Sequence, residues 1–388
     1  MVSPVGRARE APRVRLREVL LEWTRIGAVG FGGPPAHVAL LRELCVGRRG
    51  WLDEEQFEDA VAATNLLPGP ASTQLAIFCA WRVGGRTGAL VGGLGFIAPG
   101  LVLIIALAAV LLSGSPPDWL LGAGAGAGAA VAAVAVRAGA DLLPASQRRT
   151  HGAQRARWML YLLLGAAAAA TVGPWLVLVL LGCGLAELGL RGSGLRLASI
   201  VPWPLAAMGS AAFGALAWTA LKVGALSYGG GFVIIPLMQA DAVEVNGWMT
   251  STEFLDAVAL GQVTPGPVVQ TVAVVGYAAA GLGGALLAAF VAFAPSFVFV
   301  LLGAQRFERL TANRGVRAFL DGAGPAAIGA ILGSAVPLAL ALEEPWQYAI
   351  LAAAAVALLL LSRGVVVTLV AAGGAGALAV LAGAAVPA

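Results

Sequence analysis

The first part of this chain recurs 197 residues later in the sequence. Between positions 25 and 70, 16 of the 46 residues are identical to the residue 197 positions further on, without a gap. Trp51 matches Trp248, and Pro68-Gly69-Pro70 matches Pro265-Gly266-Pro267. An internal repeat in a chain with 59% hydrophobic residues is typical of membrane transporters built from two related halves.

The composition supports a protein embedded in a membrane. Only 11% of the 388 residues are charged, whereas a soluble domain carries roughly a quarter. The 53 glycines suit helices that pack closely in lipid, where small residues let backbones approach. We therefore predict an all-α polytopic membrane protein with about 10 to 12 membrane helices. The net charge of +4 reflects arginines at expected helix ends, so we expect a lipid bilayer and no nucleic acid as partner.

Histidines and cysteines do not indicate a metal site, a cofactor or a disulfide. His37 and His151 are far apart in the sequence, and none of Cys45, Cys79 and Cys183 belongs to a Cys-x-x-Cys pair. The chain also has no Gly-x-Ser-x-Gly or His-Glu-x-x-His pattern. An intramembrane enzyme is therefore the least favoured class, and we expect no catalytic residues.

Clusters of glycine and proline divide each half into broken and unbroken helices. Residues 1–15 are expected to form a basic cytoplasmic arm, 16–197 the first repeat and 198–388 the second. Segments 16–46 and 57–82 are interrupted by glycine and proline that no regular helix crosses intact. The breaks are Gly32-Gly33 and Pro68-Gly69-Pro70, repeated as Gly229-Gly230-Gly231 and Pro265-Gly266-Pro267. Further helices are expected at 88–112, 118–137, 158–171, 175–190, 200–221, 283–304, 318–341, 346–361 and 365–386.

Loop charges predict that the two repeats have opposite orientations. The loop after the first break contains Arg42, Arg48 and Arg49, whereas its counterpart 239–253 has no basic residue. The loop 113–118 also has none, whereas its counterpart carries four arginines. Because Lys and Arg favour the cytoplasmic side, we predict inverted-topology repeats with a cytoplasmic N-terminus. Each broken segment either turns back at its break or crosses fully, and arginines on both flanks favour turning back.

Broken helices at membrane depth are predicted to form an anion site. A break leaves backbone N–H groups without partners, and the half-helix that follows points its positive end at the break. Arg25 and Lys222 occupy equivalent positions, seven residues before each glycine pair. Two buried cations beside several helix N-termini would suit a small dianion. The predicted substrate-binding residues are Arg25, Gly32, Gly33, Asn65, Pro68, Gly69, Ser72, Thr73 and Gln74, then Lys222, Gly229, Gly230, Gln262, Thr264, Gly266 and Gln270.

These residues also have structural interpretations. Arg25 and Lys222 can each extend to the membrane interface or pair with a carboxylate such as Glu22. The hydroxyl and amide groups beside the breaks can bond carbonyls that the breaks free, such as those before Thr64 and Thr264. Asp59 and Asp256, equivalent residues nine positions before each Pro-Gly-Pro, could carry protons in a coupled cycle or cap a helix. His37 is a third coupling candidate, or a structural hydrogen-bonding residue.

The motifs resemble those of the chromate ion transporter family. Phe31-Gly32-Gly33-Pro34 with His37 is similar to its first signature, and Leu66-Leu67-Pro68-Gly69-Pro70 followed by Thr73-Gln74 to its second. The C-terminal versions run from Gly229 to Pro236 and from Thr264 to Pro267. The resemblance covers residues 16–388, and Arg25 fills the family's basic position before the glycine pair.

The resemblance implies a two-domain protein of the cell inner membrane that exports chromate from the cytoplasm and confers chromate resistance. It also implies sulfate, a similar dianion, as a ligand or competitor. Two residues depart from the family pattern: Asn65 stands where Gln is frequent, and Gly30 where Ser is frequent. Both departures leave fewer donors in the first half, which bears on affinity more than on function.

Three functions remain open at this stage. The first is a secondary transporter that exports chromate by alternating access at the repeat interface. The second is a carrier of sulfate or another oxyanion. The third is a passive anion channel, since broken helices are compatible with conduction. A homodimer is compatible with each of them.

Overall fold

A computed structural model describes residues 14–64, 69–113, 116–148, 150, 152–171, 176–191, 212–227, 234–303 and 313–387. The described residues form helices and turns and contain no strand. Four helical stretches, 71–111, 118–147, 268–303 and 314–340, are long and apolar enough to cross a membrane. These observations confirm the prediction of an all-α membrane protein.

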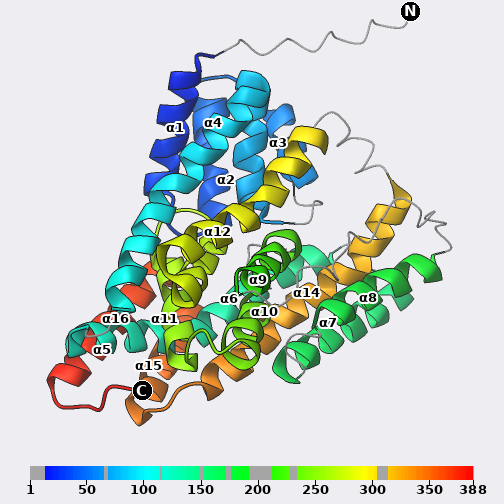
Figure 1. Ribbon diagram of the computed structural model, residues 1–388. Helices are drawn as coiled ribbons and strands as arrows, with labels where there is room; N and C mark the ends of the chain where they lie inside the picture. The colour runs from blue at the N-terminus through cyan, green and yellow to red at the C-terminus, as the bar shows by residue number, and fades with distance from the viewer. Residues whose placement is uncertain are drawn as a thin grey trace, which may run out of the picture.

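The helices of the first half follow the expected order of broken and unbroken segments (Figure 1). They are α1 (Leu16–Val29), α2 (Pro34–Arg42), the π-helix η1 (Glu43–Arg48), α3 (Glu54–Thr64), α4 (Ala71–Leu111), α5 (Asp118–Ala129), α6 (Val131–Gln147), α7 (Ala153–Thr171) and α8 (Leu176–Leu190).

The second half begins at α9 within the described residues and repeats the same order. Its helices are α9 (Ala212–Leu226), α10 (Ile234–Gln239), the π-helix η4 (Ala240–Val245), α11 (Ser251–Val263), the short 3₁₀ turn η5 (Val268–Gln270), α12 (Thr271–Gly303), α14 (Arg314–Leu340), α15 (Pro345–Ala355), the π-helix η7 (Val356–Leu360) and α16 (Val365–Leu381).

The repeat is visible in the backbone as well as in the sequence. The π-helices η1 and η4 begin and end 197 residues apart, and the turn glycines that follow have φ values of +57° (Gly50) and +59° (Gly247). After the Pro-Gly-Pro motif the offset becomes 196, since the kink of α4 lies at Gly85 and that of α12 at Gly281. The second half therefore has one residue fewer between the Pro-Gly-Pro motif and the kink. The 3₁₀ turn η5, which uses fewer residues per turn, stands where the first turn of α4 stands and accounts for the difference.

Both α4 and α12 reverse direction at these kinks. A Cβ on Gly88 would lie 2.5 Å from the carbonyl oxygen of Ala80, although residues eight apart in a straight helix are separated by about 12 Å. The same contact joins Gly284 to Gly276 in α12. The left-handed conformation of Gly85 (φ +66°) permits the turn at little steric cost. In Figure 1 the long limbs that follow run in opposite directions, downward in α4 and upward in α12.

The first broken segment turns back at its break, one of the two arrangements that the sequence left open. Arg49, just after η1, pairs with Glu18 at 2.9 Å and with Glu22 at 2.6 Å, and both glutamates belong to α1. Arg48 also bonds Glu22, at 2.7 Å. The end of η1 therefore lies beside the first two turns of α1, and α1, α2 and α3 all lie toward the same end of the molecule (Figure 1).

Some boundaries differ from those predicted. The expected helix 118–137 extends to residue 147 and divides at Ala130 into α5 and α6. Of the expected helix 200–221, only the part from residue 212 is described, and α9 continues to Leu226. The predicted boundary between the repeats, at 197/198, lies outside the described residues. The three π-helices were not predicted, because no simple residue pattern specifies them.

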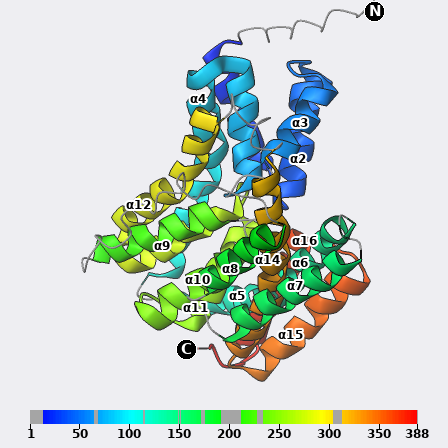
Figure 2. The same ribbon diagram turned by 90° about the vertical axis from the view of Figure 1, so that its right-hand side faces the viewer.

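Small residues bring helices from different parts of the chain together. A Cβ on Gly165 of α7 would lie 1.9 Å from the carbonyl oxygen of Ala326 in α14. Gly376 of α16 fits against Gly122 of α5 in the same way, at 2.1 Å. Figure 2 shows α7, α8 and α14 side by side. Because these helices touch through their backbones, packing rather than polar contact holds much of the bundle.

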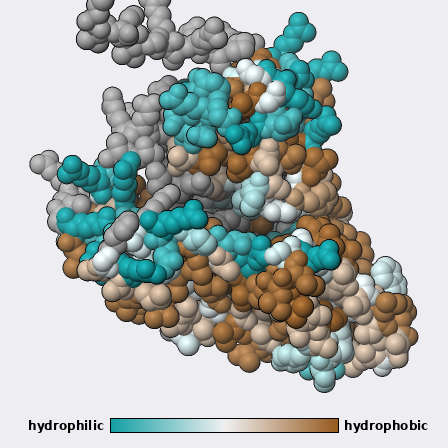
Figure 3. Space-filling view, turned by 180° about the vertical axis from the view of Figure 1, so that it is seen from behind, coloured by the Kyte–Doolittle hydropathy of each residue, from teal (hydrophilic) through white to brown (hydrophobic). Residues whose placement is uncertain are grey.

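Much of the surface is apolar. In Figure 3, hydrophilic residues gather near the end from which the N-terminal arm extends and again at mid-height on the left, whereas hydrophobic residues cover much of the rest of the face shown. Exposed large side chains such as Phe290, Leu302, Leu360 and Leu378 are 68–76% accessible. Such a surface is expected where side chains face lipid.

Equivalent capping boxes begin α3 and α11, although their residues differ. Asp53 accepts from the backbone N–H of Gln56 at 2.8 Å, and Thr250 accepts from that of Glu253 at 3.2 Å. We expect Thr250→Ala to destabilise the protein by about 1 kcal/mol, because a backbone N–H loses its partner. Thermal unfolding in detergent measures this loss. Thr250→Ser should retain the wild-type stability, and an equal loss in both variants would contradict the capping role.

Candidate functional site

The breaks of the two halves meet each other across the molecule. The backbone N–H of Gly266, in the second break of the second half, donates to the carbonyl oxygen of Gly30 at 3.0 Å. Gly30 directly precedes the first break of the first half. In the reciprocal contact, a Cβ on Gly69 would lie 3.2 Å from the carbonyl oxygen of Gly224. The first break of the first half therefore lies against the second break of the second half, and the last turns of α9 lie against Gly69 in the second break of the first half.

Helix α4 packs closely against the Pro265-Gly266-Pro267 motif. A Cβ on Gly100 would lie 2.0 Å from the carbonyl oxygen of Pro265 and 2.6 Å from Oε1 of Gln270. Gln270 is fully buried, and its Nε2 donates to the hydroxyl of Thr264 and to the carbonyl of Pro265, both at 2.9 Å. Gln270 thus fixes the shape of the motif, and its Oε1 has no hydrogen-bond partner among the described residues.

Hydroxyl groups beside the breaks bond backbone carbonyls. Thr64 donates to the carbonyl of Ala60 at 2.9 Å, and Thr264 donates to that of Leu260 at 2.7 Å. Ser72, Thr73 and Gln74 occupy the first turn of α4 and are at most 3% exposed. Thr64 and Thr264 therefore bond carbonyls of their own helices, four residues back.

His37 lies inside the first break. Its Nε2 donates to the carbonyl oxygen of Gly30 at 2.9 Å, because a carbonyl oxygen can only accept. The ring is fully buried and stands edge-on to Phe96, with centroids 4.9 Å apart. The oxygen of Gly30 therefore receives one donor from its own half and one, the N–H of Gly266, from the other.

Glycines shape the start of α2 at the same break. Gly32 and Gly33 have φ values of +95° and +74°, and Gly33 is the residue directly before α2. These left-handed conformations allow the chain to turn and leave the first N–H groups of α2 at the break. The predicted site residues Asn65, Pro68, Gly229 and Gly230 lie outside the described residues.

Lys222 forms an ion pair, one of its two structural alternatives, with a partner that the sequence analysis did not name. Its ammonium group contacts Oδ2 of Asp241 in η4, and Thr219 donates its hydroxyl to the same oxygen at 2.8 Å. The two charged side chains are 12% and 7% exposed. The ammonium group also lies 5.6 Å from the ring centroid of Trp218, within reach of a cation–π interaction. The equivalent residue, Arg25, lies on the exposed side of α1.

Only an approximate positional signal for this pair is present in the sequence. Lys222 and Asp241 flank the Gly229-Gly230-Gly231 break, eight residues before and eleven residues after Gly230. The loop charges place Asp241 in a loop, whereas the structure places it in η4.

The equivalent carboxylates Asp59 and Asp256 stand in different environments. Asp59 is exposed on α3, whereas Asp256 is 4% exposed on α11. The Asp256 carboxyl group faces the glycines of α5, where a Cβ on Gly124 would lie 2.7 Å from Oδ2. Oδ1 of Asp256 has no hydrogen-bond partner among the described residues. Two glycines, Gly124 and Gly128, therefore make room for this buried carboxyl group.

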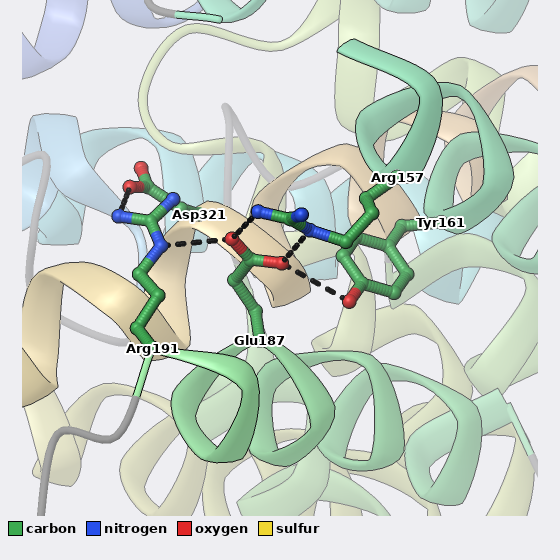
Figure 4. Close-up of polar contacts among 5 residues, drawn as sticks. All are labelled: Arg157, Tyr161, Glu187, Arg191 and Asp321. Carbon is green, nitrogen blue, oxygen red and sulfur yellow. Dashed lines mark hydrogen bonds and ion pairs between the residues drawn. The ribbon is translucent and has the colours of Figure 1, made fainter. Parts of the chain in front are cut away.

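A third buried carboxylate joins three helices away from the breaks (Figure 4). Glu187 of α8 is 1% exposed and accepts from Arg157 at 2.9 and 3.1 Å, from Tyr161 at 3.1 Å and from Arg191 at 2.8 Å. Arg191 also pairs with Asp321 of α14 at 2.9 Å. Only the spacing of Glu187 and Arg191, four residues apart on one helix, could have indicated part of this network from the sequence.

The fold defines a membrane protein with two repeats whose broken helices meet one another. Comparison with known proteins shows the family. The model of the chromate transporter family matches residues 17–188 and 214–378 of this chain. The chain is 32% identical over 351 residues to the chromate transport protein of Cupriavidus metallidurans, covering 87% of this chain and 86% of that one. It is 31% identical over 356 residues to the chromate transport protein of Pseudomonas aeruginosa, covering 86% and 83%. This chain belongs to the chromate transporter family.

A third relative, a probable chromate transport protein of Synechococcus elongatus, is 31% identical over 340 residues, with 84% and 85% of the two chains covered. No solved structure matches the chain. The arrangement of the breaks therefore comes from this structure alone, and the family comes from the sequence comparisons.

Proposed function

We propose that this protein carries chromate across the inner membrane and exports it from the cytoplasm by alternating access. The observation that carries this proposal is the crossed contact between the breaks, where Gly266 of one half donates to Gly30 of the other. A site formed between two halves opens to one side or the other when the halves rock. The names of the relatives in Cupriavidus metallidurans and Pseudomonas aeruginosa support chromate as the substrate.

The chemistry of the breaks suits a small dianion. The start of α2 presents backbone N–H groups and the positive end of a helix. Lys222 supplies a largely buried ammonium group on α9, the helix whose Gly224 carbonyl faces Gly69. The buried amides of Gln262 and Gln270, which are at most 8% exposed, can reorient toward oxyanion oxygens. Sulfate has the same charge and shape, so it is expected to compete.

The membrane potential favours export of such an ion. Moving one elementary charge through 100 mV changes the free energy by about 2.3 kcal/mol, and a dianion leaving an inside-negative cell gains twice that. Arg48 and Arg49 lie beside the first turns of α1, which supports a cytoplasmic location for this end of the molecule. Export of the dianion alone is therefore downhill without a second energy source, and a proton that leaves with it would halve the charge moved and the electrical gain.

The test is uptake of radiolabelled chromate into energised inside-out vesicles that contain the full chain. We expect accumulation in the wild type, a loss of at least tenfold in Lys222→Gln, and competition by added sulfate. Arg363→Gln, which removes an exposed arginine in the loop before α16, is the matched control and should transport like the wild type. Arg25→Gln measures what the exposed equivalent of Lys222 contributes.

Each other outcome changes the proposal in a defined way. A wild-type protein that is inserted correctly and accumulates no chromate excludes chromate export. Sulfate accumulation that exceeds that of chromate assigns the native cargo to sulfate. Currents far above the turnover of a carrier assign a passive channel, and unchanged uptake in Lys222→Gln removes this lysine from the site.

A further inference from the structure

We propose that Asp241 couples dianion binding to the uptake of one proton, because Asp241 and the dianion compete for Lys222. This inference rests on the proposed function and deepens it. The Lys222–Asp241 ion pair is the resting form. When the dianion binds Lys222, the carboxylate left behind takes a proton and becomes the neutral acid.

The position of Lys222 makes the competition possible. Lys222 precedes Gly224 by two residues on α9, and the carbonyl of Gly224 faces Gly69 at the break of the other half. Lys222 and Gly224 therefore lie in the same turn of α9, so one helical segment carries both the ion pair and the contact with the other half. Its side chain is 12% exposed, so it is mostly dehydrated before any ion arrives. A dianion would offer this ammonium group two negative charges in place of one.

Asp241 has little else to balance its charge once Lys222 leaves. Thr219 donates a hydroxyl hydrogen to Oδ2, whereas the nearby amide of Asn246 donates to the backbone carbonyl of Asp241 and not to its carboxylate. The residue is 5% exposed, so water does not replace the lysine. Burying an uncompensated carboxylate is costly, and taking a proton removes that cost.

The surrounding elements supply no other cation that pairs with Asp241 among the described residues. Lys222 is the only charged residue of α9, and α10 has none. Glu244 is the other charged residue of η4 and is exposed. The charged groups of the helices packed around η4 and α10 are Glu253 and Asp256 of α11 and Arg314, Arg317 and Asp321 of α14.

The charges of the exchange balance. Before binding, the ammonium group and the carboxylate sum to zero. After binding, the ammonium group, the dianion and the neutral acid sum to one negative charge, and the single proton that was added comes from water on the side where the dianion enters. By linkage, the dianion must then bind more tightly as the pH falls.

Asp256 is a weaker candidate for this role. It is buried, but no cation pairs with it among the described residues, so binding of an anion at Lys222 would not change its partners. Asp59 is exposed. In the first half, the position equivalent to Asp241 is Leu44, so coupling of this kind is a property of the second half alone.

The experiment compares protons taken up per chromate ion bound, by the purified full chain in weakly buffered detergent solution with a pH indicator. Chromate itself binds protons near neutral pH, so the informative quantity is the difference between the wild type and Asp241→Asn. We expect the wild type to take up close to one more proton per ion. Asp241→Asn should bind chromate at least as tightly as the wild type, with a smaller pH dependence, and the exposed Glu244→Gln should match the wild type.

A second variant, Thr219→Val, tests the inference even if Asp241→Asn fails to fold. Thr219→Val removes the remaining hydrogen bond to the carboxylate while retaining the ion pair, so it favours the neutral acid and should tighten chromate binding severalfold at a fixed pH. Equal proton uptake in the wild type and Asp241→Asn, or weaker binding in Thr219→Val, would overturn the inference. A wild-type protein that binds no chromate would instead overturn the proposed function.

Discussion

Glu187→Ala is expected to lower the free energy of unfolding by about 3 kcal/mol. The substitution removes a carboxylate that is 1% exposed and accepts four hydrogen bonds from Arg157, Tyr161 and Arg191. Losing one side of a buried ion pair leaves the other charges uncompensated. The arginine side chains are 34% and 31% exposed and can partly turn to water, which places the effect at the low end of the range for buried pairs.

Thermal unfolding of the detergent-solubilised protein measures this effect. Asp321→Asn is the matched comparison, because Asp321 is 34% exposed and bonds only Arg191 in the same network. It should cost less than about 1 kcal/mol, as exposed pairs usually do. Equal stability of Glu187→Ala and the wild type would mean that packing, rather than this network, joins α7 and α8 to α14.

Gly224→Ala and Gly27→Ala are expected to impair the protein to a similar extent. A Cβ on Gly224 would lie 2.0 Å from the carbonyl oxygen of Ala292, and one on Gly27 would lie 2.3 Å from that of Phe96. A backbone oxygen cannot move without its helix, so we expect each alanine to cost about 1 to 3 kcal/mol. Gly224→Ala should also reduce vesicle transport, because its carbonyl faces Gly69 at the break.

Unfolding temperature and chromate uptake are measured together on these variants. Gly283→Ala of α12 is the control, since a Cβ there meets no atom within 4 Å, and alanine is the better helix residue. It should be as stable as the wild type or more stable. Behaviour of Gly224→Ala that matches Gly283→Ala would show that α9 and α12 can separate without loss.

Local features of the fold were predictable because glycine and proline act on their own backbone. The breaks at Gly32-Gly33 and at Pro265-Gly266-Pro267 lie where the sequence predicted them. The kinks at Gly85 and Gly281 fall between expected helices, and their left-handed φ values explain why glycine stands there.

Contacts between distant helices could not be predicted in this way. Nothing in a single sequence states that the N–H of Gly266 meets the oxygen of Gly30, or that Gly100 lies against Pro265. The equivalence of Arg25 and Lys222 suggested matching roles, yet one is exposed and the other is paired with Asp241. Symmetry of sequence thus gave the positions of charges, whereas their partners depend on tertiary packing.

The crossed contact between the breaks also limits how the two halves can diverge. The acceptor for the N–H of Gly266 is supplied by the half that contains Gly30, so a change at one break alters a hydrogen bond that belongs equally to the other copy. The copies already differ at 30 of the 46 aligned residues, among them Gly30, whose counterpart is Ser227. Because the contact joins two backbone atoms, side chains there can change only while each copy keeps the backbone course that the other copy needs.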